Sequence, residues 1–261
     1  MKLSRVLKTA LAVLALAPAL AWSAPGTGLS GTAHDFTTAT GGLMGTNAVE
    51  VGVCTYCHTP HKALSTLLLW NHTLSANTFS WDVAKTTAGT DFPAIAGGTY
   101  KGPTAKCLSC HDGSVAIGDI AWFKEAPHTG VAANNPFKIG GVGDTAMLIT
   151  KVQGGGDMSG NHPVAMPYSY GGTANTYNGK TGGAGLALAE WVANPAAPVR
   201  LFNDDGTGAI SAGAVTGKTG IECSSCHDPH NKAANEDYFL RGKLTGSTAA
   251  SGYLCLQCHI K

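Results

Sequence analysis

The sequence repeats one five-residue pattern, Cys-x-x-Cys-His, at four places: CTYCH at 54–58, CLSCH at 107–111, CSSCH at 223–227 and CLQCH at 255–259. These motifs contain all eight cysteines of the chain. An even number of cysteines in an exported protein would ordinarily indicate disulfides. The fixed spacing, with a histidine after every second cysteine, instead indicates one chemistry shared by four sites.

Cys-x-x-Cys-His is the attachment sequence of c-type haem. Two thiols on one helical turn can form thioether bonds to the two vinyl groups of a porphyrin, and the adjacent histidine supplies an axial nitrogen to the iron. A Cys₄ zinc site does not need that histidine, and a thioredoxin-type site gives no reason for four copies. Four covalent haems are therefore predicted, with thioethers at Cys54, Cys57, Cys107, Cys110, Cys223, Cys226, Cys255 and Cys258 and proximal iron ligands at His58, His111, His227 and His259.

The composition is unusual for a chain of 261 residues, a length for one or two domains. Only 13% of the residues are charged and 7% are aromatic, and 35 are glycine. Abundant glycine disfavours long helices, and a net charge of +1 gives no basic excess for nucleic acid. Because porphyrins would supply the missing apolar surface, we expect mostly coil with short helices wrapped around haem faces, little regular secondary structure, and folding that depends on haem attachment.

Residues 1–23 are expected to be an export signal. Lys2, Arg5 and Lys8 precede an Ala/Leu run at 9–21, and small residues follow at cleavage spacing. The run is short for a membrane span of about 20 residues, so an uncleaved anchor is the less favoured alternative. We expect a mature protein that has no membrane span and is secreted, to the cell surface or beyond it, with the periplasm as the alternative.

The remaining histidines are the candidates for the second axial position of each iron. Three of the four methionines beyond the signal lie in one glycine-rich region, which favours bis-histidine over His/Met ligation and implies lower potentials. A histidine three residues after a motif cannot reach the far side of its own haem but could reach a neighbouring haem. A histidine before proline lies on extended backbone, which could direct its ring from a loop toward an iron. The candidate distal ligands are His162, His61, His230, His72 and His34, whereas His128 is expected to be an exposed bystander.

An internal repeat divides the chain. The first motif continues as Thr59-Pro60-His61 and the third as Asp228-Pro229-His230, and each is followed by a simpler motif. We therefore expect an N-terminal dihaem unit at 24–130, a Gly-rich middle segment at 131–215 that supplies His162, and a C-terminal paired-motif unit at 216–261. Within the middle, only 145–152 and 186–193 have apolar runs that suggest a strand or short helix.

The order of motifs resembles a known family. The C-terminal pattern, from Cys223 through Phe239-Leu240-Arg241 to His259, resembles the paired domain of multihaem cytochromes. The upstream elements resemble the tetrahaem outer-surface cytochromes of metal-reducing microbes (OmcE type), which polymerise into extracellular nanowires; these elements are His34-Asp35-Phe36, His58-Thr-Pro-His61, Leu69-Trp70-Asn71-His72, His111-Asp-Gly113 and Asn161-His162-Pro-Val164. The resemblance implies a continuous stack of bis-histidine haems and one histidine donated across the subunit interface, with His34 or His72 as its candidate.

The leading functional hypothesis is extracellular electron transfer by a tetrahaem cytochrome that is an electron carrier and not an enzyme. Its expected partners are further copies in a head-to-tail filament, other cytochromes and extracellular electron acceptors. A soluble periplasmic shuttle is the alternative. A multihaem oxyanion reductase is less favoured, because all four motifs end in histidine. Since each haem brings two carboxylates, we also expect reduction to be coupled to proton uptake.

Overall fold

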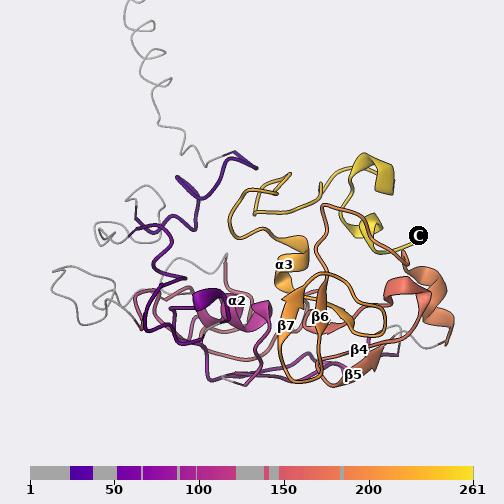
Figure 1. Cartoon of the computed structure of the whole chain (residues 1–261), viewed down its shortest axis with the longest axis horizontal. Coiled ribbons are helices and arrows are strands. Elements are labelled where there is room, and N and C mark those ends of the chain that lie inside the picture. Colours follow the sequence, from indigo (N-terminus) through magenta and orange to yellow (C-terminus); the bar gives the residue numbers. More distant parts are fainter. Residues whose placement is uncertain are drawn as a thin grey trace, which may run out of the picture.

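The computed structural model describes residues 24–37, 52–65, 67–86, 89–97, 99–121, 138–140, 147–182 and 185–260. The expected signal at 1–23 and the bystander His128 lie outside these residues. Figure 1 shows short helices and strands joined by long irregular stretches. Within the described ranges, no helix has the length and apolar character needed to cross a membrane.

The helices are short, and both α-helices of the described residues lie at attachment motifs. Helix α2, Pro103–His111, has a proline in its first turn, where the missing N–H leaves no hydrogen bond unmade. Gly113 follows its end with φ of 70°, a left-handed conformation that favours glycine. Helix α3, Cys223–Cys226, is a single turn. Short 3₁₀ helices lie at Leu67–Leu69 (η4), Tyr170–Gly172 (η6), Gly185–Glu190 (η7), Ala249–Ser251 (η8) and Cys255–Gln257 (η9).

The strands have two or three residues each and are all antiparallel to their neighbours. A four-stranded sheet has the order β3-β8-β6-β7, with β3 at Met166–Pro167, β6 at Phe202–Asp204, β7 at Ile210–Ala212 and β8 at Thr219–Ile221. Two further pairs are β1 with β2, at Thr78–Phe79 and Ile95–Ala96, and β4 with β5, at Asn175–Tyr177 and Lys180–Gly182.

The β4–β5 hairpin turns on Asn178 and Gly179, whose φ angles are 49° and 69°. Two consecutive left-handed residues suit a two-residue type I′ turn, for which Asn-Gly is preferred. The hairpin packs against the four-stranded sheet, and Tyr177 forms a small buried cluster there with Phe202 and Ile210. The Tyr177 hydroxyl donates to Glu222, the residue directly before α3, at 2.5 Å.

The described residues bury their side chains in three small clusters. Besides the cluster at the sheet, one gathers around Phe36, Tyr56 and Ile120. Another gathers around Phe79 and Leu108. The absence of a single large core from this part of the chain agrees with the low aromatic content.

The structure agrees with some expectations for the elements and differs from others. Helical turns occur at α2, α3 and η9, and residues 53–57 of the first motif form turns. The helix η7 falls in the predicted run at 186–193. The four-stranded sheet and the β4–β5 hairpin were not predicted, because their strands are too short to show alternation. Strand β8 also joins residues after position 215 to the middle segment.

We predict that Gly220→Ala destabilises the protein. The added Cβ would lie 2.3 Å from the Tyr177 ring, inside van der Waals contact. Overpacking of this kind lowers the free energy of unfolding by about 1–3 kcal/mol. Denaturant unfolding of the haem-loaded protein measures this loss. Gly52→Ala is the matched control, because its Cβ would come no closer than 3.7 Å to the Thr55 Oγ1; equal stability of the two variants would contradict the packing described here.

Candidate haem-attachment sites

The attachment motifs lie next to one another in chain order. The thiols of Cys107 on α2 and Cys223 on α3 share a hydrogen bond, so these two helices meet at their cysteines. Cys110 lies near Cys57 and contributes to raising its thiol pKa, and Cys258 does the same for Cys226. The first motif is thus beside the second, the second beside the third, and the third beside the fourth.

Burial keeps four of the motif thiols protonated in the folded chain. Burial raises the pKa of Cys57, Cys110 and Cys226 to about 12. It raises the pKa of Cys258 to about 11. A thiol with such a pKa is a weak nucleophile.

In three motif histidines, one ring nitrogen is hydrogen-bonded to a backbone carbonyl. The Nδ1 of His58 lies 2.6 Å from the Leu68 carbonyl oxygen, that of His111 lies 2.8 Å from Met147 O, and that of His227 lies 2.8 Å from Tyr238 O. A carbonyl only accepts, so Nδ1 carries the hydrogen in each ring. The lone pair then lies on Nε2, which is the arrangement an iron-binding imidazole needs.

Three motif histidines, His58, His111 and His259, face other histidines at one repeated distance. The ring centres are 6.1 Å apart for His111 and His34, 6.2 Å for His58 and His230, and 6.2 Å for His259 and His162. Two imidazoles on opposite sides of one metal, each bonded at about 2.0 Å, have ring centres about 6 Å apart. The three pairs therefore fit an iron whose other four ligands come from a porphyrin.

The partner rings in two of these pairs also have Nδ1 directed to a carbonyl. His34 Nδ1 lies 3.2 Å from Pro229 O and His162 Nδ1 lies 2.9 Å from Pro163 O. Burial, with a smaller contribution from His111, lowers the pKa of His34 to about 4. A neutral ring with its lone pair on Nε2 is competent to bind a metal.

The structure places His72 differently. Its ring is buried, with Nδ1 2.8 Å from Thr73 O and Nε2 2.9 Å from Ala116 O. Its Nε2 is also 3.5 Å from the Cys110 sulfur. A neutral imidazole has a single N–H and cannot donate to both carbonyls, and burial lowers the pKa of His72, which disfavours the doubly protonated cation.

Two other predicted site residues have different surroundings. His61 is exposed on the loop after the first motif. His227 has no second imidazole against it within the described ranges. The described residues also contain no group of three or more His, Cys, Asp or Glu that could hold a metal ion, whereas a haem iron needs only two ligands from protein.

The internal repeat of the sequence is also a repeat of backbone structure. In the first copy, the Thr59 N–H donates to Leu69 O at 2.9 Å and His58 bridges to Trp70. Leu68 and Leu69 both have positive φ, 61° and 51°. This tight return brings the Leu68 carbonyl to the His58 ring.

The second copy repeats each of these features. The Asp228 N–H donates to Phe239 O at 2.7 Å and His227 bridges to Leu240. Tyr238 and Phe239 have φ of 57° and 60°. Two left-handed residues in succession are uncommon for residues with a Cβ, so the shared conformation identifies the return loop as part of the repeated unit.

An ion pair fixes the second copy of this loop. Arg241 Nη2 lies 3.5 Å from Asp228 Oδ1, both side chains are only 7% exposed, and Arg241 Nε donates to Ser224 O at 3.0 Å. Burial alone would raise the pKa of Asp228, but backbone N–H donors and Arg241 hold it below its ordinary value. The pair thus connects α3 to the segment between His227 and His230.

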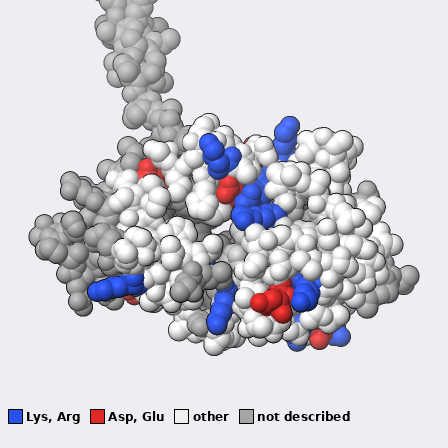
Figure 2. All heavy atoms as spheres, in the orientation of Figure 1, with Lys and Arg blue, Asp and Glu red and all other residues white. Residues whose placement is uncertain are grey.

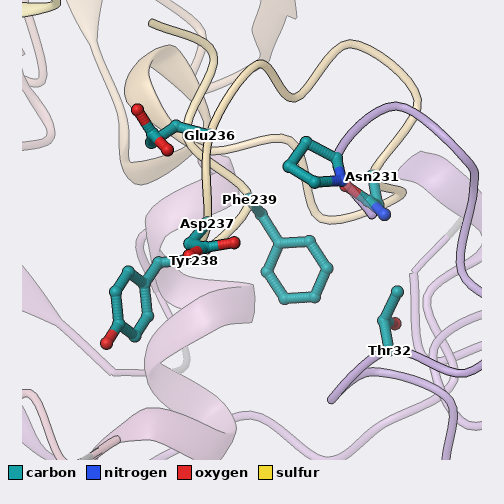
Figure 3. Close-up of a pocket in the computed structure, with 7 residues that line it drawn as sticks. Thr32, Asn231, Glu236, Asp237, Tyr238 and Phe239 are labelled. Atoms are coloured by element: carbon teal, nitrogen blue, oxygen red, sulfur yellow. The ribbon is translucent and has the colours of Figure 1, made fainter. Parts of the chain in front are cut away.

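The N-terminal segment joins the C-terminal copy and carries His34 with it. The Gly28 N–H donates to Asn231 O at 3.0 Å, and the His34 ring stacks on Phe239 with centres 4.6 Å apart. Figure 3 shows the Phe239 ring directed into a pocket between the two segments. This pocket has a volume of about 340 Å³ and is lined by Pro25, Thr32, Asn231, Glu236, Asp237, Tyr238 and Phe239.

Two features of the site were missed in the sequence. Arg241 belongs to the pattern that carries the resemblance, but no role was assigned to it. A buried carboxyl, Glu222, lies directly before the third motif and contacts Tyr100 and Tyr177. The Asn-Gly pair at 178–179 is a hairpin signal that would have placed Tyr177, whereas nothing local to Glu222 indicates its burial.

Comparison with known families identifies part of the chain. Residues 215–261 match the family model described as a doubled CXXCH motif. No curated protein matches the chain. The doubled motif indicates a multihaem, c-type cytochrome-like protein that binds haem c covalently and takes part in electron transfer.

Proposed function

We propose that the protein is a tetrahaem electron carrier that is exported and assembles into a conductive filament outside the cell. The observation that carries the electron-transfer proposal is the set of three imidazole pairs with ring centres 6.1–6.2 Å apart. Paired imidazoles suit a saturated iron, as in an electron carrier, and not the open iron of a reductase. The export signal at 1–23 supports delivery across the inner membrane.

The chain's own residues would hold and orient four haems. Each pair of cysteines would fix one porphyrin covalently, and the adjacent histidine would bind its iron. We assign the opposite ligand to His230 for the iron of His58, to His34 for that of His111, and to His162 for that of His259. When bound, haem supplies an iron that accepts and releases one electron.

The neighbouring cysteines explain how electrons would cross the molecule. The electrostatic interactions of Cys57 with Cys110, of Cys107 with Cys223 and of Cys226 with Cys258 indicate that successive attachment edges would be neighbours. The carbonyl hydrogen bonds would keep the imidazoles in fixed orientations, so little would reorganise on reduction. This arrangement supports the mostly coil, haem-wrapping fold expected from the composition.

The filament part of the proposal rests on the resemblance to outer-surface tetrahaem cytochromes. In that family one histidine crosses between subunits, and a head-to-tail contact generates an open filament. We propose that the iron of His227 receives its second ligand from a neighbouring copy, because His34 faces His111 within its own chain. A periplasmic shuttle would carry the same haems without this contact.

We predict that His34→Ala, His162→Ala and His230→Ala each convert one haem in four from low-spin to high-spin. Each variant removes one ring from a pair, which leaves an iron open to carbon monoxide. Electron paramagnetic resonance of the oxidised protein and carbon monoxide titration of the reduced protein count the affected haems. His72→Gln should leave the spin state unchanged, since His72 lies outside the three pairs. A high-spin haem in His72→Gln together with none in His34→Ala would reverse the assignment.

We also predict that the secreted fraction contains filaments in which no haem binds carbon monoxide. Subunits dissociated from them should bind one carbon monoxide per chain, because the iron of His227 loses its donated ligand. Electron cryo-microscopy of the secreted fraction and carbon monoxide titration before and after dissociation make this measurement. A protein that stays monomeric at every concentration and binds no carbon monoxide would contradict the filament proposal but not the electron-transfer proposal.

A further inference from the structure

A carboxyl is buried where two attachment helices meet. Glu222 is 1% exposed and accepts hydrogen bonds from the Tyr100 hydroxyl, from the Tyr177 hydroxyl at 2.5 Å and from the Thr104 backbone N–H at 2.8 Å. These donors come from the loop before α2, from β4 and from α2. Two segments far apart in the chain therefore converge on one carboxyl group.

This carboxyl lies at the closest approach of the second and third motifs. It precedes Cys223 directly, and the Cys223 N–H donates to the Thr104 Oγ1 at 3.2 Å. Cys223 and Cys107 share a hydrogen bond, and Glu222 acts electrostatically on both thiols. The thioether edges of two haems would flank the Glu222 side chain.

The charges around Glu222 do not neutralise it. Burial raises the pKa of Glu222, and the three hydrogen-bond donors oppose that rise. Glu222 acts electrostatically on the Lys106 ammonium of α2, which donates a hydrogen bond to Lys101 O at 3.0 Å. Asp204 of β6 adds a second negative charge on the Tyr177 side.

Tyr100 links this cluster to a pocket. Tyr100 lines a pocket of about 170 Å³ together with Lys101, Asn178 and Asp204. The hydroxyl of the same tyrosine donates to Glu222. A hydroxyl is both donor and acceptor, so it can pass a proton between the pocket and the carboxyl.

We propose that Glu222 is a redox-linked proton site, which binds one proton when one electron arrives at the haem pair held by the second and third motifs. The inference deepens the proposed electron-transfer function and rests on it. A bound haem would supply an iron that takes one electron from an upstream donor, and the Glu222 carboxylate would become a carboxylic acid with a proton from solvent. The charge of the junction is then the same before and after reduction.

The physical reason is the low dielectric of the junction. An added electron interacts strongly with a carboxylate that water does not screen. Protonation removes that repulsion and needs only a rotation of a tyrosine hydroxyl, which then accepts from the new O–H. Surface carboxylates lack this coupling, since water screens them.

The test is a redox titration of the haem-loaded protein at a series of pH values. In the wild type, the potentials of the haem pair should fall as pH rises through the titration of Glu222. In Glu222→Gln this pH-dependent fall of the potentials should be lost, and the potentials should stay near the low-pH values of the wild type. Redox-difference infrared spectra should show the C=O band of a protonated carboxyl on reduction of the wild type and not of the variant.

A second variant keeps the proposal testable if Glu222→Gln fails to fold. Tyr177→Phe removes a donor that stabilises the carboxylate, so the pH window should move upward while the carboxyl is retained. The controls are Tyr168→Phe, whose hydroxyl donates to Val192 O instead, and Asp205→Asn, an exposed carboxylate in the β6–β7 turn. Both controls should leave the window in place.

The outcomes separate this inference from the proposed function. A chain with four attached haems whose pH dependence is unchanged in both Glu222→Gln and Tyr177→Phe would overturn the inference and assign the coupling to haem carboxylates. A chain without covalent haem would overturn the proposed function itself, and haem content is measured before any titration.

Discussion

Hydrogen bonds from imidazole Nδ1 to backbone carbonyls are the interaction on which the site geometry depends. They fix the tautomer of His58, His111 and His227 and leave Nε2 directed outward. In the two copies of the repeat, the carbonyl is delivered by a loop that returns through two left-handed residues. Because a carbonyl is part of the backbone, this constraint demands a loop conformation and leaves the side chains of the loop free to differ, as Leu68 and Tyr238 do.

The polypeptide joins its parts through polar contacts as much as through apolar ones. Its buried apolar clusters are small, and Figure 2 shows that charged side chains are sparse on the face displayed. The buried polar contacts lie where distant segments meet: Asn231 binds the N-terminal segment, Arg241 binds Asp228, and Glu222 binds both tyrosines. A buried polar group without its partners is costly, so these contacts specify which segments meet.

Sequence reasoning reached the chemistry of the sites more easily than their pairing. The spacing of each motif is local, so it predicts covalent haem wherever it occurs, and Pro103 and Gly113 mark the ends of α2. The pairing of His34 with His111 joins positions far apart in the chain, and no local signal selects it over His72. Tyr100, Tyr177 and Glu222 are likewise far apart in the chain, so the sequence does not predict their contact. The hairpin at Asn178–Gly179 was predictable from its turn residues, whereas the sheet beside it has strands too short to show a period.

The contact between Cys107 and Cys223 has a consequence for biogenesis. The hydrogen bond from Cys107 lowers the pKa of Cys223, which makes Cys223 the more easily ionised thiol of the two. In an oxidising compartment, two adjacent thiols of this kind are also a substrate for disulfide formation. Such a bond would cross-link two motifs and block both from receiving a porphyrin. In such a compartment, haem would have to be attached before these two thiols come together in the folded chain.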